Sequence, residues 1–331
     1  MSNYKNQSYV IDRHGQRVNV QFDRITSRIQ TLCNDEYYGT SLDVIDPIKI
    51  TQNVVMKFSS GISTKELDQL AIDDCTEHIS HNEQYDFLAA RLAITGFIHK
   101  ETSPCIKEAT NALVTDGYDE FSDEYVQIVN KYYDQINHVI DHKRDFKFKY
   151  FGYKTILKYL KKSKKFIERP QHAYMRVAIS LFCGTPDQKG HLNDDLTEQL
   201  EQAFEFYDGL SRHYYSCASP IVLNGGTKVQ QLSSCFLLPT GDDLSTLMDT
   251  HKDCAMISKW AGGIGVWLSS IRAEGAKIGS NGTASGIKHY VKMMNELQLY
   301  VNQRGLRPGA FAMYLEPWHA DIYTFLEVLP R

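Results

Sequence analysis

Residues 220–315 place the strongest constraint on the fold, because short apolar runs alternate there with longer helical patterns. The strand candidates are residues 221–223, 235–238, 264–268 and 310–315, and the main helix candidates are residues 243–258 and 287–300. Strands that alternate with helices are typical of parallel sheets and barrels. We therefore expect an α/β architecture in this part of the chain.

The second apolar run begins at Cys235, directly after Ser233 and Ser234. A thiol at the point where a buried strand meets small polar side chains suits redox chemistry on a hydroxylated ligand. The alternative is a cysteine that only fills space in the core, since free cysteines are among the most buried residues. The residues alone leave both interpretations open.

The first hundred residues predict a small hairpin followed by four helices. The expected parts are strands at residues 9–12 and 17–21, and helices that begin near Asp23, Pro47, Ser63 and Glu83. Ser63 and Glu66 have the spacing of a capping box. Basic side chains near the hairpin could converge on phosphate groups, namely Arg13, Arg17, Arg24 and Lys100. Solvated charges on a small helical domain are the alternative interpretation.

Composition limits the class of protein. The chain has 331 residues, 42% of them apolar, with a net charge of −4. That charge argues against a general polyanion binder, so a nucleotide site must be a local basic cluster. No apolar run approaches the ~18 residues of a membrane span. Seven scattered cysteines without a CxxC pair suit reduced thiols in a cytosol-like compartment, and no metal site is expected.

The middle of the chain, residues 103–215, is expected to be helical. Its basic run at residues 158–165 is interpreted as a solvated hairpin or helix end, because no aromatic stacking platform for nucleic acid accompanies it. The segment from Glu168 to Gln171 and the helix after it are expected to serve packing rather than chemistry.

Several motifs follow one another in the second half of the chain. They are ASP at 218–220, QLSSCFLL at 231–238, ISK at 257–259, AGGIG at 261–265, IRA at 271–273, RPGAFA at 307–312 and YLEPWH at 314–319. In this order they resemble the first half of the catalytic barrel of aerobic ribonucleotide reductase large subunits of the eukaryotic and large-DNA-virus type. Weaker matches extend upstream to about Val10.

This resemblance implies three domains. They are an ATP-cone of a β-hairpin plus four helices at residues 1–102, a helical N-terminal domain at residues 103–215, and the first half of a ten-stranded α/β barrel at residues 216–331. The implied activity is reduction of ribonucleoside diphosphates to deoxyribonucleotides by thiyl-radical chemistry under allosteric nucleotide control. The alternative is a non-catalytic nucleotide-binding regulatory protein that keeps only the effector sites.

The resemblance also assigns roles to single residues. Cys235 matches one of the two thiols that deliver reducing electrons, and Ser219, Ser234 and Gly263 match residues that contact the substrate. The residues that match the ATP or dATP site are Asp12, Arg13, Val18, Asn19, Val20, Gln21, Phe22, Asp23, Arg24, Thr64, Asp68 and Lys100. Asp12 departs from the family, which usually has a basic residue there.

A second effector site, for the nucleotides that select the substrate, is implied near the helix after residue 243. The matching residues are Asp243, Leu244, Ser245, Lys259, Arg272, Gly279, Ser280, Asn302, Gln303 and Arg307. The relay loop at residues 302–308 departs from the family, because it is one residue shorter and has Asn302 in place of an aspartate and Arg304 in place of a glycine. A stiffer loop would alter the coupling between effector and substrate.

The implied partners complete the expectations. The chain itself would hold no cofactor, a di-iron small subunit would supply the radical, and thioredoxin or glutaredoxin would supply electrons. A homodimer in the cytoplasm is expected, without membrane or nucleic-acid contacts. The thiyl cysteine and the partner thiol of Cys235 belong to the second half of the family barrel. We therefore expect that the chain is one product of a split gene, one side of an intein-interrupted gene or a truncated reading frame. The expected partner is a complementary C-terminal polypeptide, and the chain alone is expected to be inactive.

Overall fold

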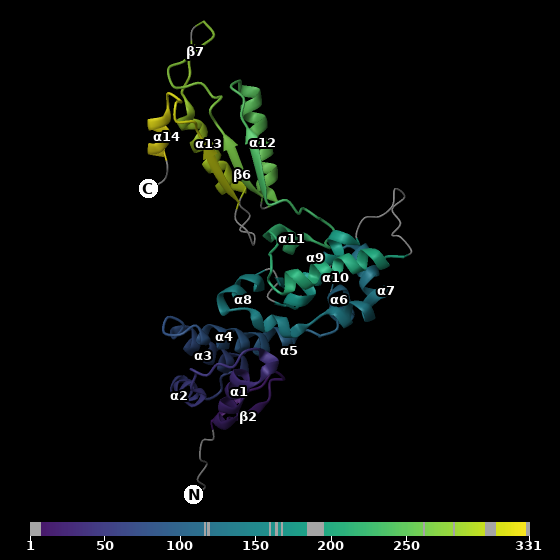
Figure 1. Ribbon diagram of the computed structural model, residues 1–331. Helices are drawn as coiled ribbons and strands as arrows, with labels where there is room; N and C mark the ends of the chain where they lie inside the picture. The colour runs from purple at the N-terminus through teal and green to yellow at the C-terminus, as the bar shows by residue number, and fades with distance from the viewer. Residues whose placement is uncertain are drawn as a thin grey trace. The chain divides into compact units, whose positions relative to one another are not determined.

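The computed structural model describes residues 8–115, 117, 120–158, 160–162, 165–166, 168–183, 195–260, 262–280, 282–301 and 309–328. The chain forms two compact units (Figure 1). The first contains the residues up to Cys217 together with Gly225–Val229, and the second contains Ala218–Asn224 together with the residues from Gln230 onward. Each unit is described by itself.

The first unit begins with an antiparallel hairpin and a group of helices. The elements are β1 Tyr9–Ile11, β2 Arg17–Asn19, α1 Phe22–Asn34, the 3₁₀ turn η1 Glu36–Tyr38, α2 Pro47–Lys57, α3 Thr64–Glu77, α4 Gln84–Ala93, the π-helical turn η2 Ile94–Ile98 and α5 His99–Glu101. The helices enclose a common core that includes Ile29, Val54, Ile72 and Leu88, all nearly inaccessible to solvent. The predicted hairpin and helical group are confirmed.

Local sequence explains where these helices begin. Asp46 accepts hydrogen bonds from the backbone N–H groups at the start of α2, where Pro47 occupies the first turn. The capping box at α3 is confirmed, since Ser63 Oγ accepts from Glu66 N and Glu66 Oε2 accepts from Ser63 N at 2.7 Å. Asp23, which can act as a helix cap and near which we expected α1 to begin, does not cap it. The helix begins at Phe22 after the N-cap residue Gln21, so Asp23 lies in its first turn.

The rest of the first unit is mainly helical, as predicted. Its elements are α6 Ile106–Thr115, α7 Asp123–Val139, the 3₁₀ turn η3 His142–Lys147, α8 Tyr150–Leu157, β3 Lys161–Lys162, β4 Lys165–Phe166, α9 Pro170–Phe182 and α10 Thr197–Ser211. The strands β3 and β4 pair antiparallel, so the basic run forms a hairpin. Helix α9 is buried from Pro170 to Ile179 and packs along α10.

The second unit is built on a parallel sheet. Its elements are α11 Ser219–Asn224, β5 Cys235–Pro239, α12 Leu244–Lys259, β6 Gly263–Trp267, β7 Lys277–Ile278, β8 Gly282–Thr283, α13 Ile287–Val301, β9 Ala310–Tyr314 and α14 Ile322–Val328. The sheet order is β5-β6-β9, and both pairings are parallel. Helices α12 and α13 pack beside the sheet (Figure 1), where Cys254, Val266 and Met294 form a buried core.

One strand expectation in this unit is wrong. Residues 221–223 lie in the short helix α11 and not in a strand. A three-residue apolar run does not distinguish a strand from a helix, and Pro220 in the first turn favours a helix start. Three of the four expected strands are therefore confirmed within the described residues. No helix in the described part of the chain is long and apolar enough to cross a membrane.

Candidate functional site

The hairpin and helices of the first unit enclose a cavity of about 250 Å³. Its apolar wall consists of Val10, Val18, Val20, Ile25, Ile29, Leu67, Ala71 and Leu92, and its polar lining consists of Asp12, Asn19, Gln21, Arg24, Arg28, Thr64, Asp68 and Lys100. An apolar wall beside a few charged groups is typical of a small-molecule site. The combination suits a ligand with a planar ring and an anionic group.

Charge is concentrated around Asp68, a buried residue of this cavity. Arg28 donates a hydrogen bond to Asp68, and Arg13 Nη2 lies 3.8 Å from the other carboxylate oxygen. Burial lowers the pKa of Lys100, and the neighbouring Arg28 guanidinium lowers it further. Arg13, Arg28 and Lys100 thus surround Asp68, and Arg13 also lies 3.7 Å from Glu101. The cations outnumber the carboxylates, so an anionic ligand would relieve their mutual repulsion.

The π-helical turn η2 explains how two arginines reach this position. Arg13 donates to the carbonyl of Gly96, and Arg28 Nη2 donates to Thr95 Oγ1 at 3.2 Å. A side chain at residue 96 would meet Asp68 Oδ2 at 2.9 Å, so the glycine permits the close approach of the carboxylate. The π-helical turn thus provides the acceptor groups that hold both arginines at the charged end of the cavity.

The structure brings together most of the residues predicted for this effector site. Of the twelve, nine line the cavity, whereas Arg13, Phe22 and Asp23 are absent from its lining among the described residues. Arg17, also considered as a phosphate donor, stacks over the Tyr9 ring at 4.7 Å instead. Sequence reasoning missed Arg28, which reaches the cavity from the second turn of α1.

Asp12, the residue that departs from the family, has a structural role. Its Oδ1 accepts hydrogen bonds from the backbone N–H groups of His14 at 2.9 Å and Gln16 at 2.8 Å. These bonds shape the hairpin turn that ends at Arg17. The carboxylate is therefore engaged in the turn, although Asp12 also lines the cavity.

The second candidate region is the sheet of the second unit. Cys235 lies opposite Gly263 in the parallel pairing of β5 and β6. The Cys235 thiol is 3.6 Å from Ser234 Oγ, and Gly263 N donates to the Ser234 carbonyl at 2.9 Å. Three of the four predicted catalytic and substrate-contacting residues therefore lie together, and the fourth, Ser219, begins α11.

Cys235 is exposed, which is a correction to the expectation of a buried strand and to the alternative of a core cysteine. All seven cysteines lie in the described residues, and it is the exposed one among them. The side chains of β5 alternate, so Phe236 and Leu238 face the helices while Cys235 and Leu237 face the opposite side. Leu237 is 79% exposed. The face that carries the thiol is therefore open to a ligand or to another polypeptide.

Three of the remaining predicted residues lie at the start of α12. Asp243 caps this helix, because its side chain accepts from Thr246 N at 3.1 Å, and Leu244 and Ser245 occupy the first turn. Hydrogen bonds from Thr246 hold the pKa of Asp243 below its ordinary value. Lys259 lies at the other end of the helix, about 24 Å away along 16 residues.

Arg272 is held by a carboxylate that sequence reasoning missed. Its Nε and Nη2 both lie 2.7 Å from Asp242 Oδ2, and its backbone N–H donates to Asp242 Oδ1. These bonds lower the pKa of Asp242. Arg272 Nη1 also donates to the carbonyl of Lys277, so the guanidinium connects the start of α12 to the β7–β8 hairpin.

Of the other members of the predicted specificity site, two lie at a hairpin tip and three lie outside the described residues. Gly279 and Ser280 form the tip of the β7–β8 hairpin, where Gly279 has a φ of +58°. Asn302, Gln303 and Arg307 lie outside the described residues, as does the rest of the predicted relay loop.

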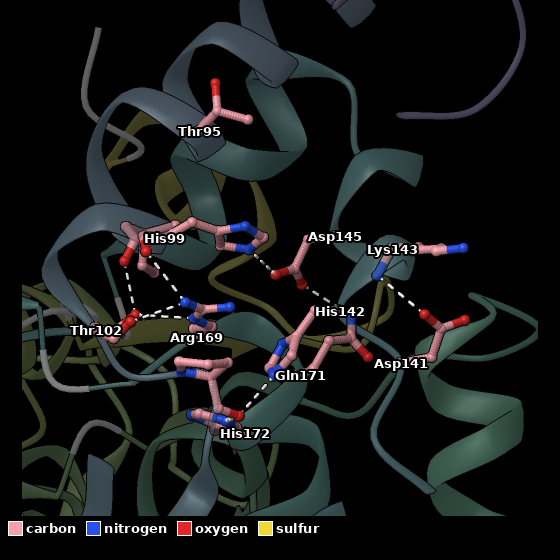
Figure 2. A network of polar contacts seen from close by, with 12 residues as sticks. Thr95, His99, Thr102, Asp141, His142, Lys143, Asp145, Arg169, Gln171 and His172 are labelled. Carbon is pink, nitrogen blue, oxygen red and sulfur yellow. Dashed lines mark hydrogen bonds and ion pairs between the residues drawn. The ribbon is translucent and has the colours of Figure 1, made fainter. Parts of the chain in front are cut away.

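A buried polar network joins α5, η3 and α9 in the first unit. Figure 2 shows His99 and Gln171 on either side of Asp145, whose carboxylate lies 2.6 Å from His99 Nε2 and 2.9 Å from Gln171 Nε2. Arg169 donates to the carbonyls of His99 and Thr102. These contacts fix the relative positions of the elements, as expected for a packing segment.

Two histidines of the same region share one acceptor. The Nε2 atoms of His142 and His172 lie 2.9 and 3.1 Å from the Pro104 carbonyl. Burial lowers the pKa of both imidazoles, most strongly for His172, which lies beside His142. Among the described residues no group of three His, Cys, Asp or Glu side chains is arranged to hold a metal ion.

Comparison with protein families defines the class. Residues 8–99 match the ATP cone domain, residues 146–230 match the all-alpha domain of ribonucleotide reductase, and residues 233–331 match the barrel domain of ribonucleotide reductase. The chain thus contains, in order, regions that match the ATP cone domain, the all-alpha domain and the barrel domain of ribonucleotide reductases. The all-alpha match runs past residue 215, where we expected the helical domain to end.

Comparison with individual proteins specifies the subunit that the chain resembles. The chain is 42% identical to the ribonucleoside-diphosphate reductase large subunit of Vaccinia virus and 42% identical to that of Danio rerio, over 97% of its own length in both cases. It is 39% identical to large chain 2 of Saccharomyces cerevisiae. It spans 41%, 39% and 36% of these relatives, respectively. The chain is therefore a homologue of ribonucleoside-diphosphate reductase large subunits and corresponds to their N-terminal portion.

Proposed function

We propose that this chain provides the effector sites and one reducing thiol of a ribonucleoside-diphosphate reductase. The observation that carries the proposal is the position of Cys235, exposed on an open sheet face beside Ser234 and Gly263. Small residues beside a thiol leave room for a ribose. The substrates would be ribonucleoside diphosphates, and the products the corresponding deoxyribonucleotides.

Cys235 acts in this proposal as one half of a dithiol. The two thiols together give up two hydrogen atoms and become one disulfide, while the 2′-hydroxyl of the ribose leaves as water and hydrogen takes its place. The second thiol belongs to the part of the barrel that the relatives have beyond the match to this chain. Thioredoxin or glutaredoxin would reduce the disulfide after each turnover.

The two proposed effector sites rest on different structural observations. ATP or dATP would occupy the cavity of the cone, with the base against the apolar wall and the phosphates near Arg28 and Lys100. Deoxynucleoside triphosphates that select the substrate would bind near the start of α12, where Arg272 offers a positive charge. Asp242 partly neutralises that charge in the present arrangement.

The proposed partners follow from the same chemistry. A small subunit with a di-iron centre would supply the radical, and a second large subunit would complete the specificity site. A polypeptide equivalent to the rest of the barrel would cover the exposed sheet face that carries Cys235 and Leu237. A cytoplasmic location is proposed because all seven cysteines are free thiols in the structure.

Reconstitution tests this proposal. The chain is mixed with the complementary barrel polypeptide and the small subunit, and conversion of CDP to dCDP is measured with thioredoxin as reductant. Turnover that requires all three proteins supports the reductase. Binding of ATP and dTTP without any turnover would instead favour a non-catalytic regulatory protein.

A further inference from the structure

A second and larger cavity of the first unit has no role in the sites described above. It has a volume of about 510 Å³ and lies where η1 and the loop after it meet α4 and η3. Its lining comes from the segments 36–42, 83–91 and 141–147. Cavities of this size are typical of sites for small organic ligands.

Arg91 is the unusual member of this lining, because it is a buried cation, only 2% exposed. Its Nη1 donates to the Leu32 carbonyl at 2.6 Å and its Nη2 to the Thr40 carbonyl at 2.7 Å, whereas Nε has no hydrogen-bond partner among the described residues. No carboxylate in the described part of the chain forms an ion pair with it. A buried charge of this kind favours an anion nearby.

An aromatic cluster forms another part of the wall. The ring centroids of Tyr38 and Phe146 are 4.9 Å apart, and Tyr37 lies 5.1 Å from Tyr38 and 5.8 Å from Phe146. Phe87 adds a further ring to the lining. Aromatic side chains packed edge to face in this way present ring surfaces on which a planar ligand can stack.

The exposed lining residues add positive charge. Lys143 Nζ lies 5.1 Å from the centroid of the Tyr37 ring, and Lys147 is exposed on the same turn. Two of the acidic lining residues are already paired, since Glu83 binds Lys149 at 2.9 Å and Asp141 lies 3.5 Å from Arg144. Arg144 is also paired with Asp208, so Lys143, Lys147 and the Nε of Arg91 are left for a ligand. Glu36, the third acidic residue of the lining, offsets one of these positive charges.

We propose that this cavity is a binding site for an aromatic organic phosphate, with nucleotides as the ligand class. The ring would lie against Tyr37, Tyr38 and Phe87, and the anionic group would lie near Arg91, Lys143 and Lys147. The site is separate from the effector cavity, although Arg91 and Leu92 are consecutive residues of α4 that line one cavity each. The proposal does not depend on reductase activity.

Photoaffinity labelling of the full chain with 8-azido-ATP tests this site directly, because each labelled peptide identifies a cavity. We expect two labelled regions, one in residues 10–30 from the effector cavity and one in residues 36–42 or 83–91 from the second cavity. Unlabelled ATP should protect both regions, and inorganic triphosphate should protect the second only weakly, since it lacks a ring.

The variant that decides the question is Lys143→Glu combined with Lys147→Glu, because both side chains are exposed. Labelling of the second region should fall about tenfold, as expected for lost charge-assisted contacts, while labelling of residues 10–30 stays unchanged. Lys49→Glu, an exposed charge reversal on α2 that lines neither cavity, is the matched control.

Three outcomes would overturn the proposal. They are labelling confined to the effector region, labelling of the second region that survives the double charge reversal, and full protection of it by inorganic triphosphate. Labelling confined to residues 10–30 would leave the proposed effector site intact and contradict only the second site. Loss of labelling in residues 10–30 alone would contradict the effector site and leave the second site intact.

Discussion

Arg28 of α1 and Asp68 of α3 form an ion pair in the lining of the effector cavity, although they are forty residues apart in the sequence. Asp68 also lies near Arg13, and Lys100 lines the same cavity. Asp68 therefore lies at the centre of the cations that we assign to the phosphates of a nucleotide, and Glu101 pairs with Arg13 at its edge.

The first prediction concerns Arg28. Arg28→Ala should weaken binding of ATP to the full chain by about tenfold, the least expected for loss of one charge-assisted contact. Arg17→Ala is the control, because Arg17 stacks on Tyr9 and does not line the cavity. Calorimetry checks both variants, and equal affinities for the two would remove Arg28 from the site.

The second prediction concerns Asp12. Asp12→Ala removes the acceptor of two backbone N–H groups and should lower the free energy of unfolding by about 1 kcal/mol. Asp12→Asn keeps a side-chain oxygen and should stay close to the parent protein. Thermal unfolding followed by circular dichroism distinguishes the two, and an Asp12→Ala variant as stable as the parent would contradict the structural role.

Acid should destabilise the first unit through His142 and His172. Both have a lowered pKa in the folded chain, so the unfolded chain binds their protons first as the pH falls below about 6.5. Their contribution to stability is complete above that pH and is lost below it, by about 1.4 kcal/mol per pH unit for each histidine that stays neutral.

A glutamine at either histidine position removes this titration, so the melting temperature of His172→Gln should fall less between pH 7 and pH 5 than that of the parent. His289→Gln, an exposed histidine on α13, is the control. The same pH dependence in His172→Gln as in the parent would show that other groups cause the acid sensitivity.

The fourth prediction concerns the specificity site. Arg272→Ala should weaken dTTP binding to the reconstituted dimer by at least about tenfold. Lys288→Ala removes an exposed charge from α13 and should leave the affinity unchanged. An unchanged affinity in Arg272→Ala would mean that the guanidinium only connects Asp242 to the β7–β8 hairpin.

Local patterns in the sequence predicted the parts of the fold that depend on neighbouring residues. The capping box of Ser63 and Glu66 and the proline at the start of α2 act within one helical turn, and both were predicted. Residues 221–223 were assigned wrongly because three apolar residues have no period, and the helix-start signal of Pro220 was not given enough weight.

The candidate sites also divide into residues that the sequence identified and residues that only the structure identified. Motif resemblance singled out Cys235 and the twelve cone residues, nine of which line one cavity. It did not single out Arg28 or Asp242, because their contacts are with partners forty and thirty residues away. The exposure of Cys235 was also missed. A strand with alternating apolar residues has a buried side only where another element covers it, and this depends on the tertiary structure.

The role of Cys235 is the central claim, and multiple-turnover reduction of CDP in the reconstituted enzyme tests it most directly. Cys235→Ser should abolish repeated turnover while ATP and dTTP still bind, whereas Cys217→Ser, a half-buried cysteine outside the predicted set, should retain the parent rate. If Cys235→Ser turned over at the parent rate, Cys235 would not be a reducing thiol and the proposed chemistry of this sheet face would be wrong.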